Sequence, residues 1–170
     1  KALLVGLTHY PKNELEWCDN DAIAMKELIE SNGDGSPNFE VITQINSCTH
    51  DLLLTLIERL FADDAEIALL YFSGHGCDAD GGYLCTTDYM SSDTIGVKMS
   101  DILEIANSSK CKNKIIILDC CFAGKMGVNL LDNNTSILGD GVTIIAASQT
   151  WQTSEEDSKL EHGVFTNLIL

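Results

Sequence analysis

The sequence predicts an α/β fold of three layers, in which helices cover both faces of a mostly parallel β-sheet. Short apolar runs rich in β-branched residues recur at 67–72, 115–118 and 142–147. Uninterrupted runs of this kind are typical of strands that are buried on both faces of a parallel sheet. Amphipathic segments lie between several of the expected strands, and this alternation is the pattern of parallel α/β domains. A chain of 170 residues suits one such domain, spanning 1–170.

The first half of the chain alternates strands and helices. Residues 2–7 are apolar and predict a buried strand. A helix follows, for which one of the polar residues 19–21 is the expected N-cap, and its apolar face comprises Ala22, Met25, Leu28 and Ile29. Residues 39–45 alternate like a strand, and Thr49 is the expected N-cap of a second amphipathic helix.

The second half contains two strands that end in unusual residues. The strand at 67–72 leads into Ser-Gly-His-Gly, and a small hairpin is expected from residues 81–84 and 86–89. Ser100 is the expected cap of a short helix, which leads to the strand at 115–118 and the letters DCCFAG. Because ligands bind at the carboxyl ends of parallel strands, we expect His75 and the two cysteines at that edge.

The end of the chain continues the same pattern. Residues 124–141 are polar and bounded by glycines, which predicts a loop. A further buried strand is expected at 142–147, a polar acidic stretch at 150–161, and the start of a helix at 163–170. His9, His50 and His162 have no setting comparable to that of His75, and we interpret them as surface or loop histidines.

The order and spacing of SGHG and DCCFAG resemble the caspase-like superfamily of cysteine peptidases, and more closely its metacaspase and bacterial caspase-like (orthocaspase) branch. The resemblance runs through most of the chain. It implies a caspase-like fold and a cysteine endopeptidase with a Cys–His dyad. By the pattern D-x-C-x-x-G, Cys121 is the nucleophile and His75 its proton acceptor, and Cys120 is the variable neighbour. The resemblance also assigns the oxyanion hole to the backbone N–H groups of Gly76 and Cys121.

Substrate specificity is expected for a basic residue, Arg or Lys, before the cut. Caspases recognise aspartate with a pocket of arginines, and the only arginine here, Arg59, is expected late in the second helix. Asp21 and Asp119 match positions that line the basic-specific pocket of metacaspases, and Ser148 follows the strand that would form its other wall. The simpler interpretation is that Asp21 caps its helix and Asp119 ends its strand.

Other chemistries fit the sequence less well. The glycines around His75 also fit a loose dinucleotide fingerprint, but a hairpin is expected where that motif needs a helix. A Cys-x5-Arg phosphatase would need an arginine where Gly127 stands, and no Gly-x-Ser-x-Gly of a serine hydrolase exists. The alternative from a different class is a catalytically silent caspase-like scaffold or regulatory module of a larger protein.

Metal binding enters only through the resemblance. No cofactor is expected to be required, and no metal ligand is assigned. In metacaspases, acidic residues after the histidine bind calcium, which assists activity, and Asp78, Asp80, Asp88 and Asp93 offer oxygen ligands in that region. Calcium is therefore an optional cofactor in this interpretation, with a solvated acidic loop as the simpler one.

Composition limits the partners and the compartment. The formal net charge of −16 argues against nucleic-acid binding, which needs clustered Lys and Arg. The sequence has no apolar run of 18 residues and no signal peptide, so no membrane partner is expected. Seven cysteines without a CxxC pair favour a reducing cytoplasm, where a catalytic thiol stays reduced. The expected partner is a peptide or protein substrate, and we expect additional domains because the chain reads as a segment of a longer protein.

Overall fold

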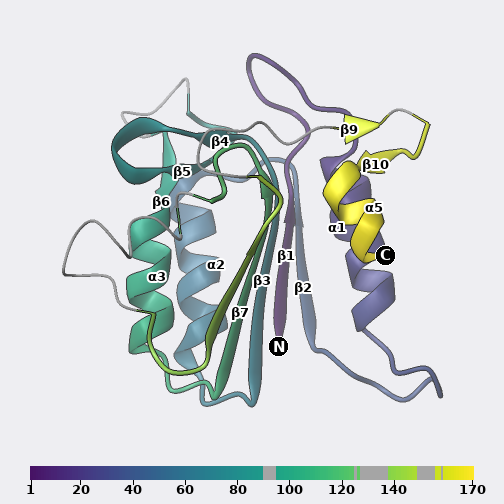
Figure 1. Cartoon of the computed structure of the whole chain (residues 1–170), viewed down its shortest axis with the longest axis vertical. Helices are drawn as coiled ribbons and strands as arrows, with labels where there is room; N and C mark the ends of the chain where they lie inside the picture. The colour runs from purple at the N-terminus through teal and green to yellow at the C-terminus, as the bar shows by residue number, and fades with distance from the viewer. Residues whose placement is uncertain (90–94, 125, 127–137, 149–155, 158) are drawn as a thin grey trace.

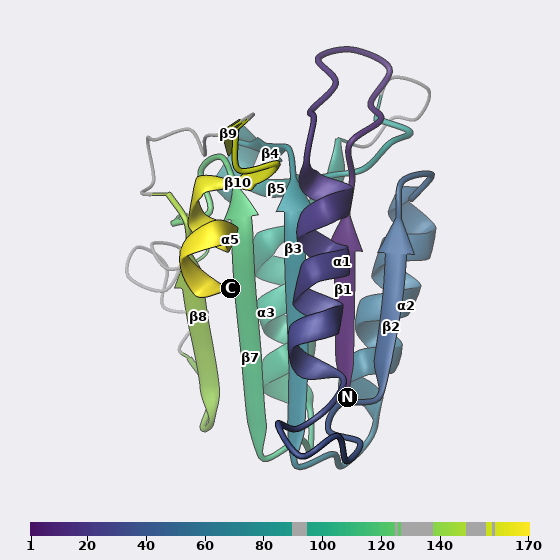
Figure 2. The same ribbon diagram turned by 90° about the vertical axis from the view of Figure 1, so that its right-hand side faces the viewer.

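The computed structural model describes residues 1–89, 95–124, 126, 138–148, 156–157 and 159–170. The main sheet has five parallel strands in the order β2-β1-β3-β7-β8. Helices α2 and α3 cover one face of this sheet and α1 and α5 cover the other (Figures 1 and 2). The bounds of these elements are β1 Ala2–Gly6, α1 Cys18–Ile29, β2 Val41–Ile45, α2 His50–Ala62, β3 Ile67–Gly74, α3 Met99–Ser108, β7 Asn113–Cys120, β8 Val142–Ala146 and α5 Val164–Ile169. This arrangement confirms the predicted three-layer α/β fold.

The central strands divide the core into two layers because their side chains alternate between the faces of the sheet. On β1, Leu3 and Val5 pack in the layer beneath α2 and α3, whereas Leu4 packs in the layer beneath α1 and α5. Strand β3 repeats the alternation with Leu70 and Tyr71. Both layers are apolar, which explains why these strands are continuous apolar runs in the sequence.

A second, antiparallel sheet lies beyond the carboxyl end of β3 (Figure 1). It contains β4 (Gly76–Cys77), β5 (Tyr83–Cys85) and β6 (Gly96–Lys98), and the short 3₁₀ helix η1 (Ala79–Gly81) joins the first two. The hairpin expected between residues 81–84 and 86–89 is therefore wrong, because β5 pairs with β4 and β6 instead. Residues 87–89 form a turn in which Thr86 Oγ1 donates to Asp88, while the Asp88 carboxylate also accepts the His50 N–H.

Three smaller expectations are corrected. Helix α1 begins at Cys18 with Trp17 as its N-cap, so none of residues 19–21 caps it. Helix α3 follows directly from β6 with Lys98 as its N-cap, and Ser100 lies inside its first turn. Strand β8 is the edge strand of the described sheet, where Ile145 keeps 42% of its surface exposed, so it is not buried on both faces. The Thr49 cap is confirmed, because its side chain accepts the Leu52 N–H.

The C-terminal part of the described chain returns to the top of the sheet in Figure 1. Strands β9 (Glu156–Asp157) and β10 (His162–Gly163) pair there and lead into α5. The loop expected at 124–141 and the polar stretch at 150–161 fall largely outside the described residues. Within the described ranges, no helix combines the length and the apolar character needed to cross a membrane.

Candidate active site

His75 and Cys121 follow neighbouring strands. Strands β3 and β7 are paired in parallel register, and the last pair of partners is Gly74 with Cys120. His75 and Cys121 are therefore the next residues along two adjacent strands, at the carboxyl edge of the sheet. The two strands are neighbours, as a pairing of His75 with Cys121 requires.

The two adjacent cysteines have different environments. The Cys120 side chain is 1% exposed and belongs to the core, and burial raises the pKa of its thiol well above the ordinary value. Cys121 is half-buried and begins the turn that follows β7. A thiol must be accessible and able to ionise to act as a nucleophile, so this difference favours Cys121.

Ser148 braces the turn that carries Cys121. Its hydroxyl donates to the Cys120 carbonyl at 2.8 Å and accepts the Ala123 N–H at 3.2 Å. The Ser148 carbonyl accepts the Gly124 N–H at 2.9 Å, and Phe122 has a left-handed φ of 57°. A bulky residue in that conformation is strained, and the surrounding contacts must hold it. Ser148 thus lies beside the nucleophile, and its contact with substrate stays a prediction.

A backbone carbonyl orients the imidazole of His75. The Nε2 atom lies 2.5 Å from the carbonyl oxygen of Asn13, in the loop between β1 and α1. A carbonyl only accepts hydrogen bonds, so Nε2 carries the hydrogen in this contact. In a neutral imidazole the other nitrogen, Nδ1, is then the proton acceptor. No local pattern indicates Asn13 in advance, although asparagine is one of the residues that tolerate its left-handed φ of 57°.

Gly76 lies directly against the turn at residues 121–124, which we call the nucleophile turn. A Cβ atom added to Gly76 would lie 2.0 Å from the Cys121 carbonyl oxygen and 3.2 Å from the Cys120 sulfur. No side chain fits in that space, so the close approach of the two backbones explains the glycine. The position agrees with the expected oxyanion hole, whose assignment to the N–H groups of Gly76 and Cys121 stays a prediction.

Two carboxylates, Asp21 and Asp119, lie together where Gly163 packs against them. Asp21 is fully buried in α1 and accepts a 2.9 Å hydrogen bond from Ser73 at the end of β3. Asp119 is 4% exposed, and a Cβ added to Gly163 would touch both carboxylates, at 2.6 Å from Asp119 and 3.0 Å from Asp21. Burial raises the pKa of Asp21, the hydrogen bonds it accepts oppose the shift, and the charge of Asp119 adds to it. Because Trp17 is the N-cap of α1 and Asp21 lies inside the helix, the interpretation of Asp21 as a helix cap is wrong.

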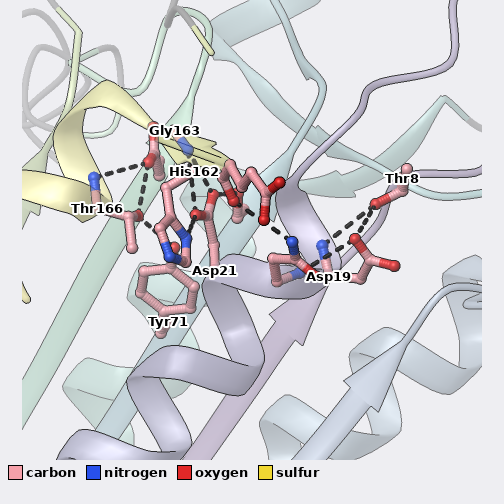
Figure 3. A network of polar contacts seen from close by, with 11 residues as sticks. Thr8, Asp19, Asp21, Tyr71, His162, Gly163 and Thr166 are labelled. Carbon is pink, nitrogen blue, oxygen red and sulfur yellow. Dashed lines mark hydrogen bonds and ion pairs between the residues drawn. The ribbon is translucent and has the colours of Figure 1, made fainter. Parts of the chain in front are cut away.

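The C-terminal segment closes over the two carboxylates. His162 Nδ1 lies 2.9 Å from Asp21, and the Gly163 N–H donates to the same carboxylate at 3.1 Å (Figure 3). The backbone N–H and the hydroxyl of Thr166 donate to Asp119 at 3.2 and 2.7 Å. Our interpretation of His162 as a surface or loop histidine missed this contact. Ser73 and Thr166 were also missed, because their roles depend on partners far away in the sequence.

Two of the four acidic residues proposed for calcium, Asp80 and Asp88, contact other groups of the chain. Asp80 forms an ion pair with Lys98 at 2.7 Å, and Asp88 is engaged by Thr86 and by the start of α2. Asp93 lies outside the described residues. Among the residues that the structure describes, no group of three or more His, Cys, Asp or Glu is arranged to hold a metal ion. The calcium site stays a prediction.

The comparison with protein families agrees with this geometry. A model of the caspase domain, in a peptidase family, matches residues 1–170. The chain belongs to the caspase family. This confirms the resemblance to caspase-like cysteine peptidases, and the metacaspase branch stays a prediction. No curated protein matches this caspase domain.

Proposed function

We propose that this caspase domain is a cysteine endopeptidase that cleaves peptide bonds after Arg or Lys. The observation that carries the proposal is the register of β3 and β7, which brings His75 and Cys121 to adjacent positions. The hydrogen bond from Nε2 to the Asn13 carbonyl supports the role of His75, because it leaves Nδ1 to accept a proton from the thiol.

The proposed reaction has two steps. The Cys121 thiolate attacks the scissile carbonyl, and His75, which holds the thiol proton, transfers it to the leaving amine. Water, deprotonated by His75, then hydrolyses the acyl-enzyme and releases the second product. Backbone N–H donors at Gly76 and Cys121 stabilise the oxyanion, and each such donor contributes roughly 3–4 kcal/mol to the transition state.

Asp21 and Asp119 support specificity for a basic residue. Asp119 lies on β7 two residues before the nucleophile, and Asp21 lies on α1, where it accepts a hydrogen bond from Ser73 on the neighbouring strand β3. The two buried carboxylates form a site of negative charge, and Ser73 supplies a further polar group. A guanidinium binds two carboxylate oxygens in a defined planar geometry, and an ammonium binds as a point charge. Arg59 lies in the last turn of α2, near Lys1 and Asp63 at the amino end of β1, which is the opposite end of the sheet. An arginine pocket for aspartate is therefore not available from this side chain.

Matched fluorogenic peptides that end in Arg, Lys, Asp or Leu test the proposal. We expect cleavage of the Arg and Lys peptides by the wild type, no cleavage by Cys121→Ala, and most of the activity in Cys120→Ala. His75→Ala should lose as much as Cys121→Ala, because members of a catalytic unit act together. Preference for Asp or Leu would refute the specificity, and an inactive Cys120→Ala beside an active Cys121→Ala would refute the nucleophile.

The competing function is a catalytically silent scaffold, and a labelling experiment distinguishes it from a peptidase. An alkylating peptide ketone with a basic residue should add its mass to Cys121 of the wild type, as measured by mass spectrometry after proteolysis. Absence of both labelling and cleavage would favour the scaffold.

A further inference from the structure

Tyr10 contacts His75 through both its ring and its hydroxyl group. Its side chain is 4% exposed and lies in the loop between β1 and α1. The two ring centroids are 4.6 Å apart, with an angle of 54° between the ring planes. The Tyr10 hydroxyl accepts the His75 backbone N–H at 3.0 Å and donates to the Cys85 carbonyl at 3.2 Å.

The backbone of His75 needs these partners because the parallel sheet ends there. The ladder between β3 and β7 stops at Gly74 and Cys120, and β4 begins at Gly76. The His75 carbonyl accepts the Cys85 N–H at 2.9 Å, and the Tyr10 hydroxyl takes the N–H. A buried backbone group without a partner is costly, so the hydroxyl helps to fix the point where the chain leaves one sheet and enters the other.

The neighbouring residues fit this arrangement. A Cβ added to Gly74 would lie 2.6 Å from the Tyr10 hydroxyl, so the glycine leaves room for it. Burial raises the pKa of Tyr10 well above its ordinary value, which keeps the hydroxyl neutral and able both to donate and to accept. Tyr89 packs edge-on against Tyr10 and donates to the Lys12 carbonyl at 3.3 Å. The loop that carries Tyr10 also carries the Asn13 carbonyl that binds Nε2.

We propose that Tyr10 is a positioning residue for His75. The Tyr10 hydroxyl holds the main chain of His75, and the Tyr10 ring holds the tilt of the His75 imidazole. The proposal rests on the proposed function, in which His75 takes the proton of Cys121. Nothing in this role requires Tyr10 to touch the substrate. Its removal should therefore slow the chemical step and leave substrate binding almost unchanged.

Tyr10→Phe is the sharpest test, because it keeps the ring and removes only the hydroxyl. On an Arg peptide we expect kcat to fall by about 10- to 100-fold with KM within about twofold, since small displacements of a catalytic group have effects of this size. The pH profile of Cys121 alkylation by iodoacetamide, read by peptide mapping, should change, because a displaced His75 no longer accepts the thiol proton from the same position. Tyr83→Phe on β5 is the matched control, and thermal unfolding of each variant checks the fold.

The outcomes separate this proposal from the peptidase assignment. Unchanged kcat and an unchanged alkylation profile in Tyr10→Phe overturn the role of Tyr10, even where wild type cleaves and Cys121→Ala does not. Where wild type cleaves no peptide, the peptidase assignment fails, and the alkylation profile alone decides: a shift supports positioning, and no shift overturns it. Should Tyr10→Phe not fold, Gly74→Ala displaces the same hydroxyl and is expected to reproduce both changes, and its failure to do so overturns the proposal.

Discussion

Replacement of Gly76 by alanine should separate two backbones that the active site holds together. The added Cβ atom would lie 2.0 Å from the Cys121 carbonyl oxygen and 3.0 Å from its carbon, and both are main-chain atoms. Ordinary contact begins at 3.4 Å, so β4 and the nucleophile turn must move apart by about 1.4 Å to go from 2.0 Å to 3.4 Å. No flexible side chain is available to absorb the shift.

This displacement acts on the catalytic step more than on binding. The N–H groups of Gly76 and Cys121 are the expected oxyanion donors, and His75 is the residue before Gly76. A misplacement of about 1 Å costs about 100-fold in rate, so kcat on an Arg peptide should fall by at least that factor. Overpacking should also lower the free energy of unfolding by about 1–3 kcal/mol.

The chain supplies a matched control for the same chemical change. A Cβ on Gly33, in the loop after α1, meets nothing within 4 Å and the residue has no left-handed φ. Gly33→Ala should therefore keep full activity and leave the free energy of unfolding unchanged or higher by about 0.4–1 kcal/mol. Steady-state kinetics, active-site titration and thermal unfolding compare Gly76→Ala with Gly33→Ala. Activity of Gly76→Ala within threefold of wild type would refute the reasoning.

Two further predictions concern the specificity pocket and the buried thiols. Asp119→Ala should lower kcat/KM on Arg peptides by about 30-fold or more, which corresponds to about 2 kcal/mol for one lost partner of a buried charged pair. Thr166→Val removes the hydroxyl contact to Asp119 but keeps the carboxylate and the backbone N–H contact, and an equal loss in that variant would indicate anchoring of α5 instead of recognition. Burial raises the pKa of Cys48 and Cys85 to about 12, so near pH 8 their thiolate fraction is about 1,000-fold below that of an ordinary thiol. Brief treatment with iodoacetamide should label Cys121 before either of them, and early labelling of Cys48 would contradict its burial.

Much of the fold could be predicted because its central strands are buried on both faces. Such strands must be apolar at every position, so β1, β3 and β7 are visible as continuous runs. Strand β8 was predicted to be buried, but it is an edge strand with exposed positions, and its apolar sequence does not show this. The small sheet of β4, β5 and β6 was also predicted incorrectly, since each strand has only two or three residues and pairing over such lengths has little local signal.

The sequence by itself determined the parallel α/β fold and the placement of His75 and Cys121 at one edge of the sheet. These follow from local patterns: apolar strands that end in a histidine between glycines and in a pair of cysteines. Only the tertiary structure decided which distant groups contact His75 and the carboxylate of Asp21. The Asn13 carbonyl lies 62 residues from His75 in the chain, and His162 lies 141 residues from Asp21. A backbone carbonyl is the same group on every residue, and a buried hydroxyl such as that of Tyr10 gains its partners only when distant segments pack, so no local pattern encodes these contacts.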